Sequence, residues 1–331
     1  MRIAVIGAGI AGVACARRLV AGGQTVRVFD KGRGLGGRMA TRRAPGTAFD
    51  HGAQYFTVRD DGFARQVSHL MRAGAVAEWQ ARFALAEGTG DRISAEAVSN
   101  PRYVATPHMT SLCHALAEGL DIVPQCQVEA IAPDAQGWWL DTGSSGTAGP
   151  FDTVLITIPA AQAAALIEAV APRWATAVSA CAYAPCLAAM VEYAAPLDLG
   201  LDAVRWRGDE GTLSWVARNN SKPGRPDQPE AWVLHGSPGW SAENLDKPAI
   251  ESAELLCASF AETFGIKVSA QRIDGHGWRY AQVTQPLAAA NLYDPQAALG
   301  LAGDWCRGAR VEDAWRSGDN LAGRVLAAVD C

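Results

Sequence analysis

The chain has 331 residues, of which 49% are hydrophobic and 19% charged, so it is long enough to bury a large core. Its formal net charge is −5 and like charges are not clustered, which argues against a nucleic-acid partner. The eight cysteines lack metal-ligand spacing and are expected to be reduced thiols, and no metal site is predicted. No run is long and apolar enough to span a membrane, so we expect a cytoplasmic protein. We expect it to be a monomer or a homodimer.

The first thirty residues predict the start of a βαβ unit. Residues 3–6 form a short apolar run, typical of a strand buried on both faces. Residues 11–22 have helical spacing, and residues 25–29 predict a second strand that Asp30 closes. Further on, residues 61–90 predict an amphipathic helix and a hairpin, and residues 108–120 predict another helix.

The rest of the chain alternates between two patterns. Residues 152–159 predict a buried strand before an alanine-rich helix, and residues 298–305 and 312–329 predict a last strand and helix. Between them, residues 178–285 show strands separated by Pro/Gly turns, with one helix near 249–264. The stretch "NNSKPGRPDQPE", residues 219–230, is interpreted as a mobile loop because it is rich in turn-forming residues.

The segment "GAGIAG" places Gly7, Gly9 and Gly12 in G-x-G-x-x-G order between a predicted strand and helix. This spacing allows a tight turn and a close approach of a pyrophosphate to the helix N-terminus. Asp30 follows Gly12 by 18 residues, where a carboxylate accepts hydrogen bonds from ribose hydroxyls. The combination predicts a dinucleotide-binding site.

A second glycine loop, "GRGLGGRM", favours FAD over a plain nicotinamide cofactor. Gly34, Gly36 and Gly37 would bring another backbone segment against a longer ligand, and Arg38 could neutralise its diphosphate. Farther along, Gln54 and Tyr55 in "FDHGAQYFT" could offer an amide and a phenol to a flat ring.

The segment "GLAGDWCRGARVED" predicts a strand that ends at Gly303 and Asp304 before a helix that begins near Val311. Asp304 could accept a hydrogen bond from a ribityl hydroxyl, and the helix N-terminus could face the flavin pyrimidine. We therefore expect an α/β fold, with a Rossmann-type FAD-binding domain (1–60, 100–160 and 290–331) and an inserted mixed β-sheet substrate domain (61–99 and 161–289).

Five segments together resemble the renalase family within the amine-oxidase-like flavoproteins: "FDKGRGLGGRM", "DHGAQYFT", "WVLHGSPGWSAENL", "HGWRYAQ" and "GDWCRGARVEDAWRSG". The resemblance implies a p-hydroxybenzoate-hydroxylase-like fold with noncovalent FAD. It also implies oxidation of the 2- and 6-dihydro isomers of NAD(P) to NAD(P)+, with molecular oxygen reoxidising the flavin and yielding hydrogen peroxide. The expected cofactor-binding residues are Gly7, Gly9, Ala11, Gly12, Asp30, Lys31, Gly37, Arg38, Gln54, Tyr55, Val128, Gly303, Asp304, Arg310 and Val311.

The resemblance also places His235 over the flavin, since the family has a histidine on the matching strand. Trp278 and Tyr280 are expected to line the substrate pocket, with Asn219 bonding a carboxamide. His51, His108 and His276 are interpreted as loop or helix-end residues. Hydride transfer needs little acid–base help, so stacking and positioning should carry most of the catalysis.

The residues leave other functions open. The chain has no second G-x-G-x-x-G, so a nicotinamide substrate would stack at the flavin itself. None of the four lysines matches the flavin-facing lysine of many amine oxidases, and Lys222 is interpreted as a turn residue before a proline. The alternatives are a flavin amine oxidase or desaturase, and a flavin-binding sensor without turnover.

Overall fold

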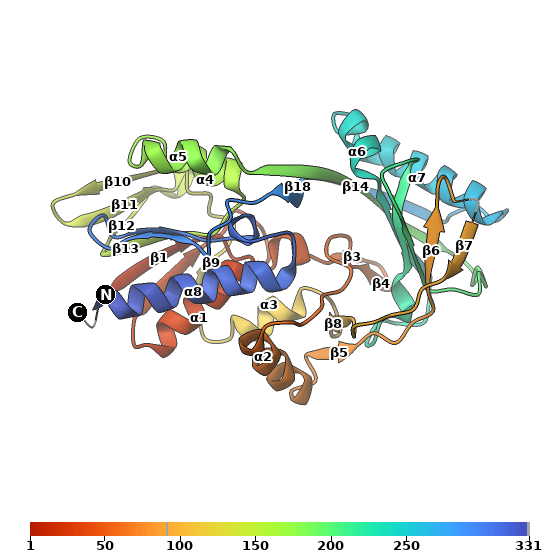
Figure 1. Cartoon of the computed structure of the whole chain (residues 1–331), viewed down its shortest axis with the longest axis horizontal. Helices are drawn as coiled ribbons and strands as arrows, with labels where there is room; N and C mark the ends of the chain where they lie inside the picture. Colours follow the sequence, from red (N-terminus) through yellow and green to blue (C-terminus); the bar gives the residue numbers. More distant parts are fainter. Residues whose placement is uncertain (91, 330–331) are drawn as a thin grey trace.

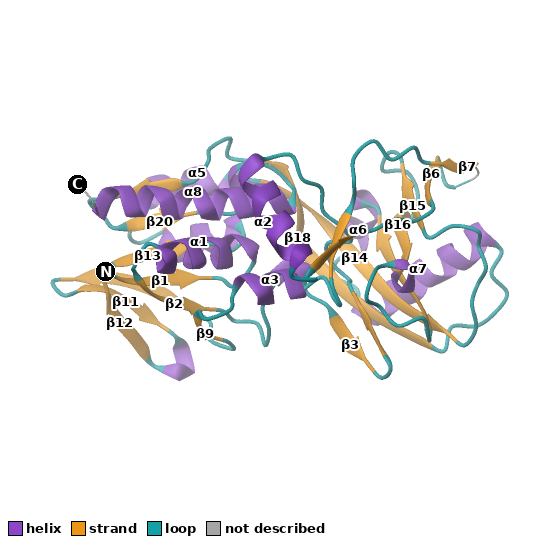
Figure 2. Ribbon diagram, turned by 90° about the horizontal axis from the view of Figure 1, so that it is seen from below, coloured by secondary structure: helices purple, strands orange, loops and turns teal. Residues whose placement is uncertain are grey.

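A computed structural model describes residues 1–90 and 92–329, so the last two residues of the predicted FAD-binding domain lie outside the described chain. The molecule has two halves, each built around one large sheet (Figure 1). The first half contains the N-terminus and the last described helix, α8 (Val311–Val329), and the long strands β14 (Ala182–Tyr193) and β18 (Arg272–Gln285) run from it into the second half (Figure 2).

A six-stranded sheet forms the centre of the first half. Its strands lie in the order β19 (Leu292–Asp294), β20 (Leu299–Leu301), β13 (Thr153–Ile156), β1 (Arg2–Ile6), β2 (Thr25–Phe29) and β9 (Asp121–Val123). All neighbouring pairs are parallel except β19 with β20. This parallel sheet explains the continuous apolar runs in the sequence, because both of its faces are covered.

Alternate residues of the central strand serve the two faces. Ile3 and Val5 pack in the core cluster that includes α1 (Ile10–Ala21), α2 (Asp61–Arg72), α3 (Ser111–Leu116) and α8 (Val311–Val329). Ala4 and Ile6 pack instead in the cluster of α4 (Ala160–Ile167), α5 (Pro172–Ser179) and a three-stranded sheet of β10 (Ala130–Asp134), β11 (Gly137–Asp141) and β12 (Thr147–Phe151). The period of two along a strand produces this division.

A seven-stranded sheet forms the second half. Its order is β18 (Arg272–Gln285), β14 (Ala182–Tyr193), β17 (Glu230–Gly236), β16 (Leu213–Arg218), β15 (Ala203–Trp206), β6 (Phe83–Glu87) and β7 (Arg92–Ala95). One face packs Trp232 and Leu234 against α7 (Ala249–Phe264), and α6 (Pro238–Asn244) contacts β14. The register places His235, His276, Trp278 and Trp215 together on the opposite face, because His235 and His276 both pair with Ala188.

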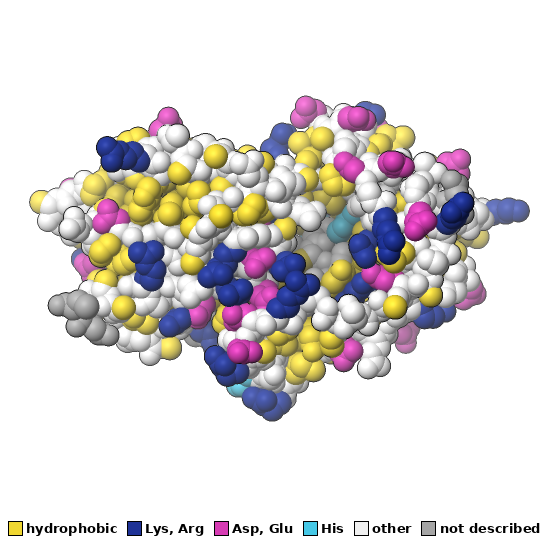
Figure 3. All heavy atoms as spheres, viewed as in Figure 1, with side chains coloured by type: hydrophobic (Ala, Val, Ile, Leu, Met, Phe, Trp, Pro, Cys, Tyr) yellow, Lys and Arg dark blue, Asp and Glu magenta, His cyan; other side chains and the backbone are white. Residues whose placement is uncertain are grey.

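Two small two-stranded sheets, the first of them a hairpin, lie between the halves. They are β3 (Arg42–Ala44) with β4 (Thr47–Phe49), and β5 (Val76–Glu78) with β8 (Tyr103–Ala105). Phe49 packs with Met190 and Val233 of the seven-stranded sheet, so the first hairpin contacts the second half directly. Figure 3 shows a hollow between the halves, with a histidine side chain at its edge.

The predicted domain limits need correction at two places. Phe63 of α2 packs against Trp315 of α8, with ring centroids 5.3 Å apart, so residue 61 still belongs to the first half. Residues 161–179 also belong there, because α4 and α5 share a core with the six-stranded sheet. The chain crosses to the second half along β14. The sequence did not indicate this boundary, because the apolar pattern of a helix does not show which sheet the helix covers. Within the described residues, no helix is long and apolar enough to cross a membrane.

Candidate active site

The first glycine loop has the geometry of a phosphate-binding turn. Gly7 adopts φ +107, which L side chains rarely reach. A Cβ on Gly12 would lie 1.9 Å from the carbonyl oxygen of Gly7, so helix and strand pack too closely for any side chain. At Gly9, by contrast, a Cβ would meet nothing within 4 Å, and no side chain caps α1. Open space therefore adjoins free N–H groups at the N-terminus of α1, which fits a pyrophosphate.

The second glycine loop lies against the first. The N–H of Gly36 donates to the carbonyl of Ala8 at 3.0 Å, and Gly36 and Gly9 form an isolated parallel bridge. Gly37 approaches so closely that its Cβ position lies 3.7 Å from Cα of Gly9. A dinucleotide at the first loop would thus also meet the second.

Asp30 and Lys31, the two residues predicted at the ribose end, directly follow β2. Asp30 accepts hydrogen bonds from the N–H groups of Ala8 at 2.5 Å and Gly32 at 2.6 Å. Lys31 is exposed, and Val128 is half-buried in the loop before β10. Ala11 is instead buried in α1, where its carbonyl lies against Gly318 of α8.

Arg38 and Asp304, both predicted to contact FAD, meet each other. The guanidinium donates to both carboxylate oxygens, at 2.6 and 2.7 Å, and also to the carbonyls of Tyr280 and Ala281 at 3.3 Å. Such a bidentate pair fixes both side chains in one plane. The second glycine loop, the β20–α8 connection and β18 therefore meet at this ion pair. Arg38 and Asp304 are 266 residues apart in the sequence.

The segment that follows Asp304 leads into the last helix, α8. The N–H of Gly303 donates to Ser317 Oγ at 3.0 Å, and α8 begins at Val311 as predicted. Arg310 is exposed, and its N–H donates to Asp313 Oδ2 at 3.3 Å. The acidic side chains Glu312 and Asp313 occupy the first turn, where they complement the helix dipole.

The backbone carbonyl of His51 joins the two halves. It accepts a hydrogen bond from His235 Nε2 at 3.1 Å and another from Trp278 Nε1 at 3.0 Å. The His51 ring lies 4.9 Å from that of His276 and 5.1 Å from that of Trp278, measured between centroids. Two predicted pocket residues are thus brought together, and His276 is a strand residue of β18, contrary to the loop interpretation. Alternation in "HGW" could have shown that 276 and 278 share a face.

These histidines are neutral near pH 7. Burial lowers the pKa of His235 to about 4, the His51 carbonyl opposes the shift, and the charge of Lys222 adds to it. Burial also lowers the pKa of His51 to about 4, with His276 and Arg42 acting in the same direction. With its Nε2 proton donated to the carbonyl, neutral His235 keeps Nδ1 as an acceptor.

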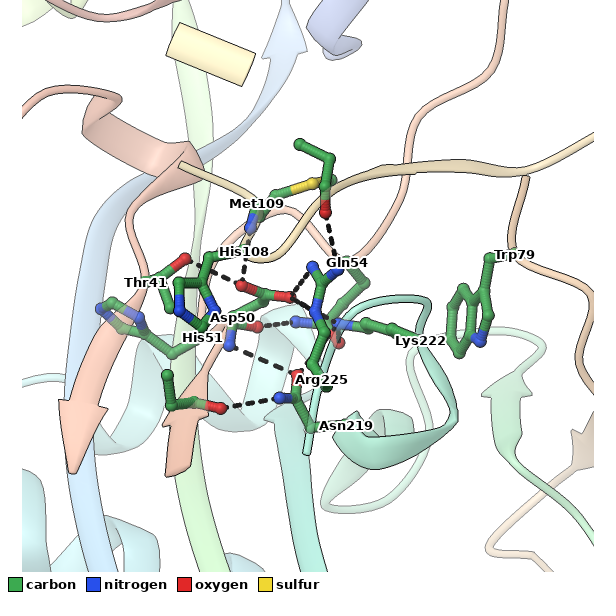
Figure 4. A network of polar contacts seen from close by, with 12 residues as sticks. Thr41, Asp50, His51, Gln54, Trp79, His108, Met109, Asn219, Lys222 and Arg225 are labelled. Carbon is green, nitrogen blue, oxygen red and sulfur yellow. Dashed lines mark hydrogen bonds and ion pairs between the residues drawn. The ribbon is translucent and has the colours of Figure 1, made fainter. Parts of the chain in front are cut away.

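A buried ion cluster lies behind this loop (Figure 4). Asp50 is fully buried and accepts from Arg225 Nη2 at 2.5 Å, from Thr41 Oγ1 at 2.8 Å and from the N–H of Met109 at 2.9 Å, while Lys222 Nζ lies 3.5 Å away. Burial alone would raise the pKa of Asp50, but the charges of Lys222 and Arg225 hold it well below its usual range. The carboxylate is therefore ionised.

Gln54 belongs to the same cluster. Its Oε1 accepts from Lys222 Nζ at 3.1 Å and from Trp215 Nε1 at 3.3 Å. Its Nε2 donates to the carbonyls of Asp50 and Gly52. Both ends of the amide are engaged within the protein, so Gln54 supports the loop. Next to it, Tyr55 is half-buried and packs against Trp215, with centroids 5.5 Å apart.

Asn219 and Lys222 occupy places that the sequence did not indicate. Asn219 is 1% exposed; its Nδ2 donates to the Ala48 carbonyl at 2.7 Å and its Oδ1 accepts from Lys222 at 3.3 Å. The amide predicted to bind a carboxamide thus lies inside the ion cluster. Lys222 is 1% exposed as well, and the interpretation of residues 219–230 as a mobile loop is wrong for these positions. Their burial depends on partners far away in sequence.

Tyr280 lies apart from the histidines. It lines an open pocket of 450 Å³ with Tyr183, Cys181 and Arg279, between α4 and the β14–β18 ribbon. Its ring contacts Tyr183 edge-on, with centroids 5.5 Å apart. Among the described residues, no group of three His, Cys, Asp or Glu side chains could hold a metal ion.

Comparisons with known proteins identify the family of this chain. A model for flavin-containing amine oxidoreductases matches residues 75–326, and one for an NAD(P)-binding Rossmann-like domain matches residues 5–73. A 4,4′-diapophytoene desaturase from Staphylococcus haemolyticus is 45% identical over 60 residues, which cover 18% of this chain and only 12% of that relative.

Solved structures share the fold over the whole length. A protein described as a protoporphyrinogen oxidase from Exiguobacterium sp. 255-15 has a TM-score of 0.77 at 12% identity and covers 98% of both chains. Cyclohexylamine oxidase from Brevibacterium oxydans IH-35A has a TM-score of 0.76 at 12% identity, covering 100% of this chain and 99% of that one. The two glycine loops fit the cofactor of such flavoproteins, FAD. This chain belongs to the flavin-containing amine oxidoreductase family.

Proposed function

We propose that the protein is a renalase-like oxidase that converts 2- or 6-dihydro isomers of NAD(P) to NAD(P)+ with noncovalently held FAD. The observation that carries the proposal is the ring surface formed by His235, Trp278 and His276, with neutral histidines, next to the second glycine loop that ends at Arg38. A flat, uncharged dihydronicotinamide ring is complementary to such a surface.

The reaction needs few acid–base groups. Bound FAD would supply the hydride acceptor, and the overall reaction, dihydro-NAD(P) + O2 + H+ → NAD(P)+ + H2O2, takes one proton from solvent. The substrate ring loses a hydride and becomes an aromatic cation, so no protein base is required. The chain's own contribution is to orient the ring. Trp278 and His235 both donate a hydrogen bond to the His51 carbonyl, and Gly52, which has no side chain, lets Trp278 pack against the loop that contains His51.

An amine substrate is the second candidate, favoured by the family and by neighbours named putrescine oxidase and cyclohexylamine oxidase. One experiment separates the two. The purified yellow protein is mixed without oxygen with each dihydro isomer, with ordinary NADH and with a panel of amines, and the flavin absorbance is followed. We expect fast bleaching by a dihydro isomer and slow bleaching by the rest. Bleaching by amines alone would reassign the enzyme to amine oxidation.

A further inference from the structure

The buried ion cluster of Asp50, Gln54, Asn219, Lys222 and Arg225 carries an unbalanced charge. Asp50 pairs with both Lys222, at 3.5 Å, and Arg225, at 2.5 Å. The side chains of these three residues are at most 1% exposed. Burial lowers the pKa of Lys222, to about 8, but still leaves it mostly protonated at pH 7. One carboxylate and two cations give the cluster a net charge of one positive unit.

This charge lies next to the ring surface of the candidate active site. Asp50 and Gln54 flank His51 and Gly52 in the chain, and the His51 carbonyl receives the hydrogen bonds of the ring surface. Lys222 bonds Gln54 from behind the same loop. Its charge contributes to the lowered pKa of His235, whose Nε2 bonds to the His51 carbonyl of the same loop.

A net positive charge affects neutral and cationic rings differently. The protein interior screens charge less than water does, so part of the field reaches a ring bound nearby. A neutral ring pays no electrostatic penalty there, whereas a pyridinium or an ammonium group is repelled. Because the cluster is buried, counterions cannot neutralise it as they would a surface lysine.

We propose that the Asp50 cluster makes the site select uncharged rings and reject cationic ones, with Lys222 as the specificity-determining residue. The inference rests on the proposed function and deepens it. A neutral dihydronicotinamide ring is accepted, and the cationic nicotinamide ring left after hydride loss is expelled. The same field disfavours protonated amines, although the fold is shared with amine oxidases.

The test uses two ligands that do not react. Nicotinamide and its 1-methyl cation have the same ring and differ in charge, and each is titrated into the FAD-loaded protein while the flavin spectrum is followed. For unit charges about 12 Å apart at an effective dielectric constant of about 20, the expected discrimination is on the order of tenfold. We expect the wild type to bind the neutral ring more tightly by about that factor.

The Lys222→Met variant removes the excess charge. Asp50 and Arg225 remain as a matched pair, so the fold should tolerate the change, and the discrimination should fall by about tenfold toward unity. Lys222→Arg should retain it. Lys247→Met is the matched control, because Lys247 is 42% exposed and pairs with Glu251 on the surface, and it should leave the ratio unchanged.

Three results would overturn the proposal. They are a wild type that binds both rings equally, a wild type that binds neither at millimolar concentration, and an unchanged ratio in Lys222→Met. If Lys222→Met loses FAD, Arg225→Met makes the same charge change and leaves the Asp50–Lys222 pair. Slow bleaching by the dihydro isomers, with clear discrimination between the rings, would sink only the proposed function.

Discussion

Replacing Asp50 with asparagine should strongly destabilise the protein. The change leaves Lys222 and Arg225 buried without a counter-charge, while the amide oxygen of the new side chain can still accept from Thr41 and Met109. Breaking a buried pair by removing one partner costs about 3–5 kcal/mol. Since a domain is stable by about 5–15 kcal/mol in total, the loss is a large fraction of the free energy of unfolding.

The assay is thermal unfolding of wild type and variants by circular dichroism at one fixed excess of FAD, because ligand concentration shifts the midpoint. At about 2–3 °C per kcal/mol, Asp50→Asn should lower the midpoint by roughly 6–15 °C. Adding Lys222→Met should recover part of that loss, because a single cation then remains. Thr41→Val, which removes one hydrogen bond to the same carboxylate, should cost only about 1 kcal/mol. A loss below about 1 kcal/mol for Asp50→Asn, or no recovery in the double variant, would refute the reasoning.

Three further predictions concern the cofactor and pH. Gly12→Ala should abolish FAD retention, read from the flavin absorbance of purified protein, because its Cβ would overlap the Gly7 carbonyl. Asp304→Asn should weaken FAD binding at least severalfold by releasing Arg38, and an unchanged dissociation constant would contradict that role. Folding lowers the pKa of His51 and of His235 from 6.5 to about 4, so between these pH values the unfolded chain binds more protons than the folded one. The free energy of unfolding should therefore fall by about 3 kcal/mol per histidine as the pH falls from 6.5 to about 4. Urea unfolding from pH 7 to pH 4 checks this, and His235→Asn should flatten the slope.

The sequence by itself determined the parts of the protein that depend on neighbours in the chain. The glycines at 7, 9 and 12 reveal a phosphate loop because Gly7 needs positive φ, Gly12 allows very close packing and Gly9 leaves open space for a ligand. Helix α7 has the predicted bounds, and β2 does too, because apolar spacing records which local period is buried. The family resemblance added His235 and Trp278, and the structure brings both to the same carbonyl.

Only the tertiary structure decided what the polar side chains do. Lys222 lies in a stretch whose prolines and glycines indicate a solvated loop, yet its partner Asp50 is 172 residues away and buries it. In the sequence His51 has the pattern of an ordinary loop residue. Only the fold brings Trp278, 227 positions later, close enough to donate a hydrogen bond to its carbonyl. The sequence gives the charge and the hydrogen-bonding groups of each side chain, but whether a side chain is buried depends on the whole fold. An ion pair and its dielectric surroundings therefore cannot be inferred from spacing along the chain.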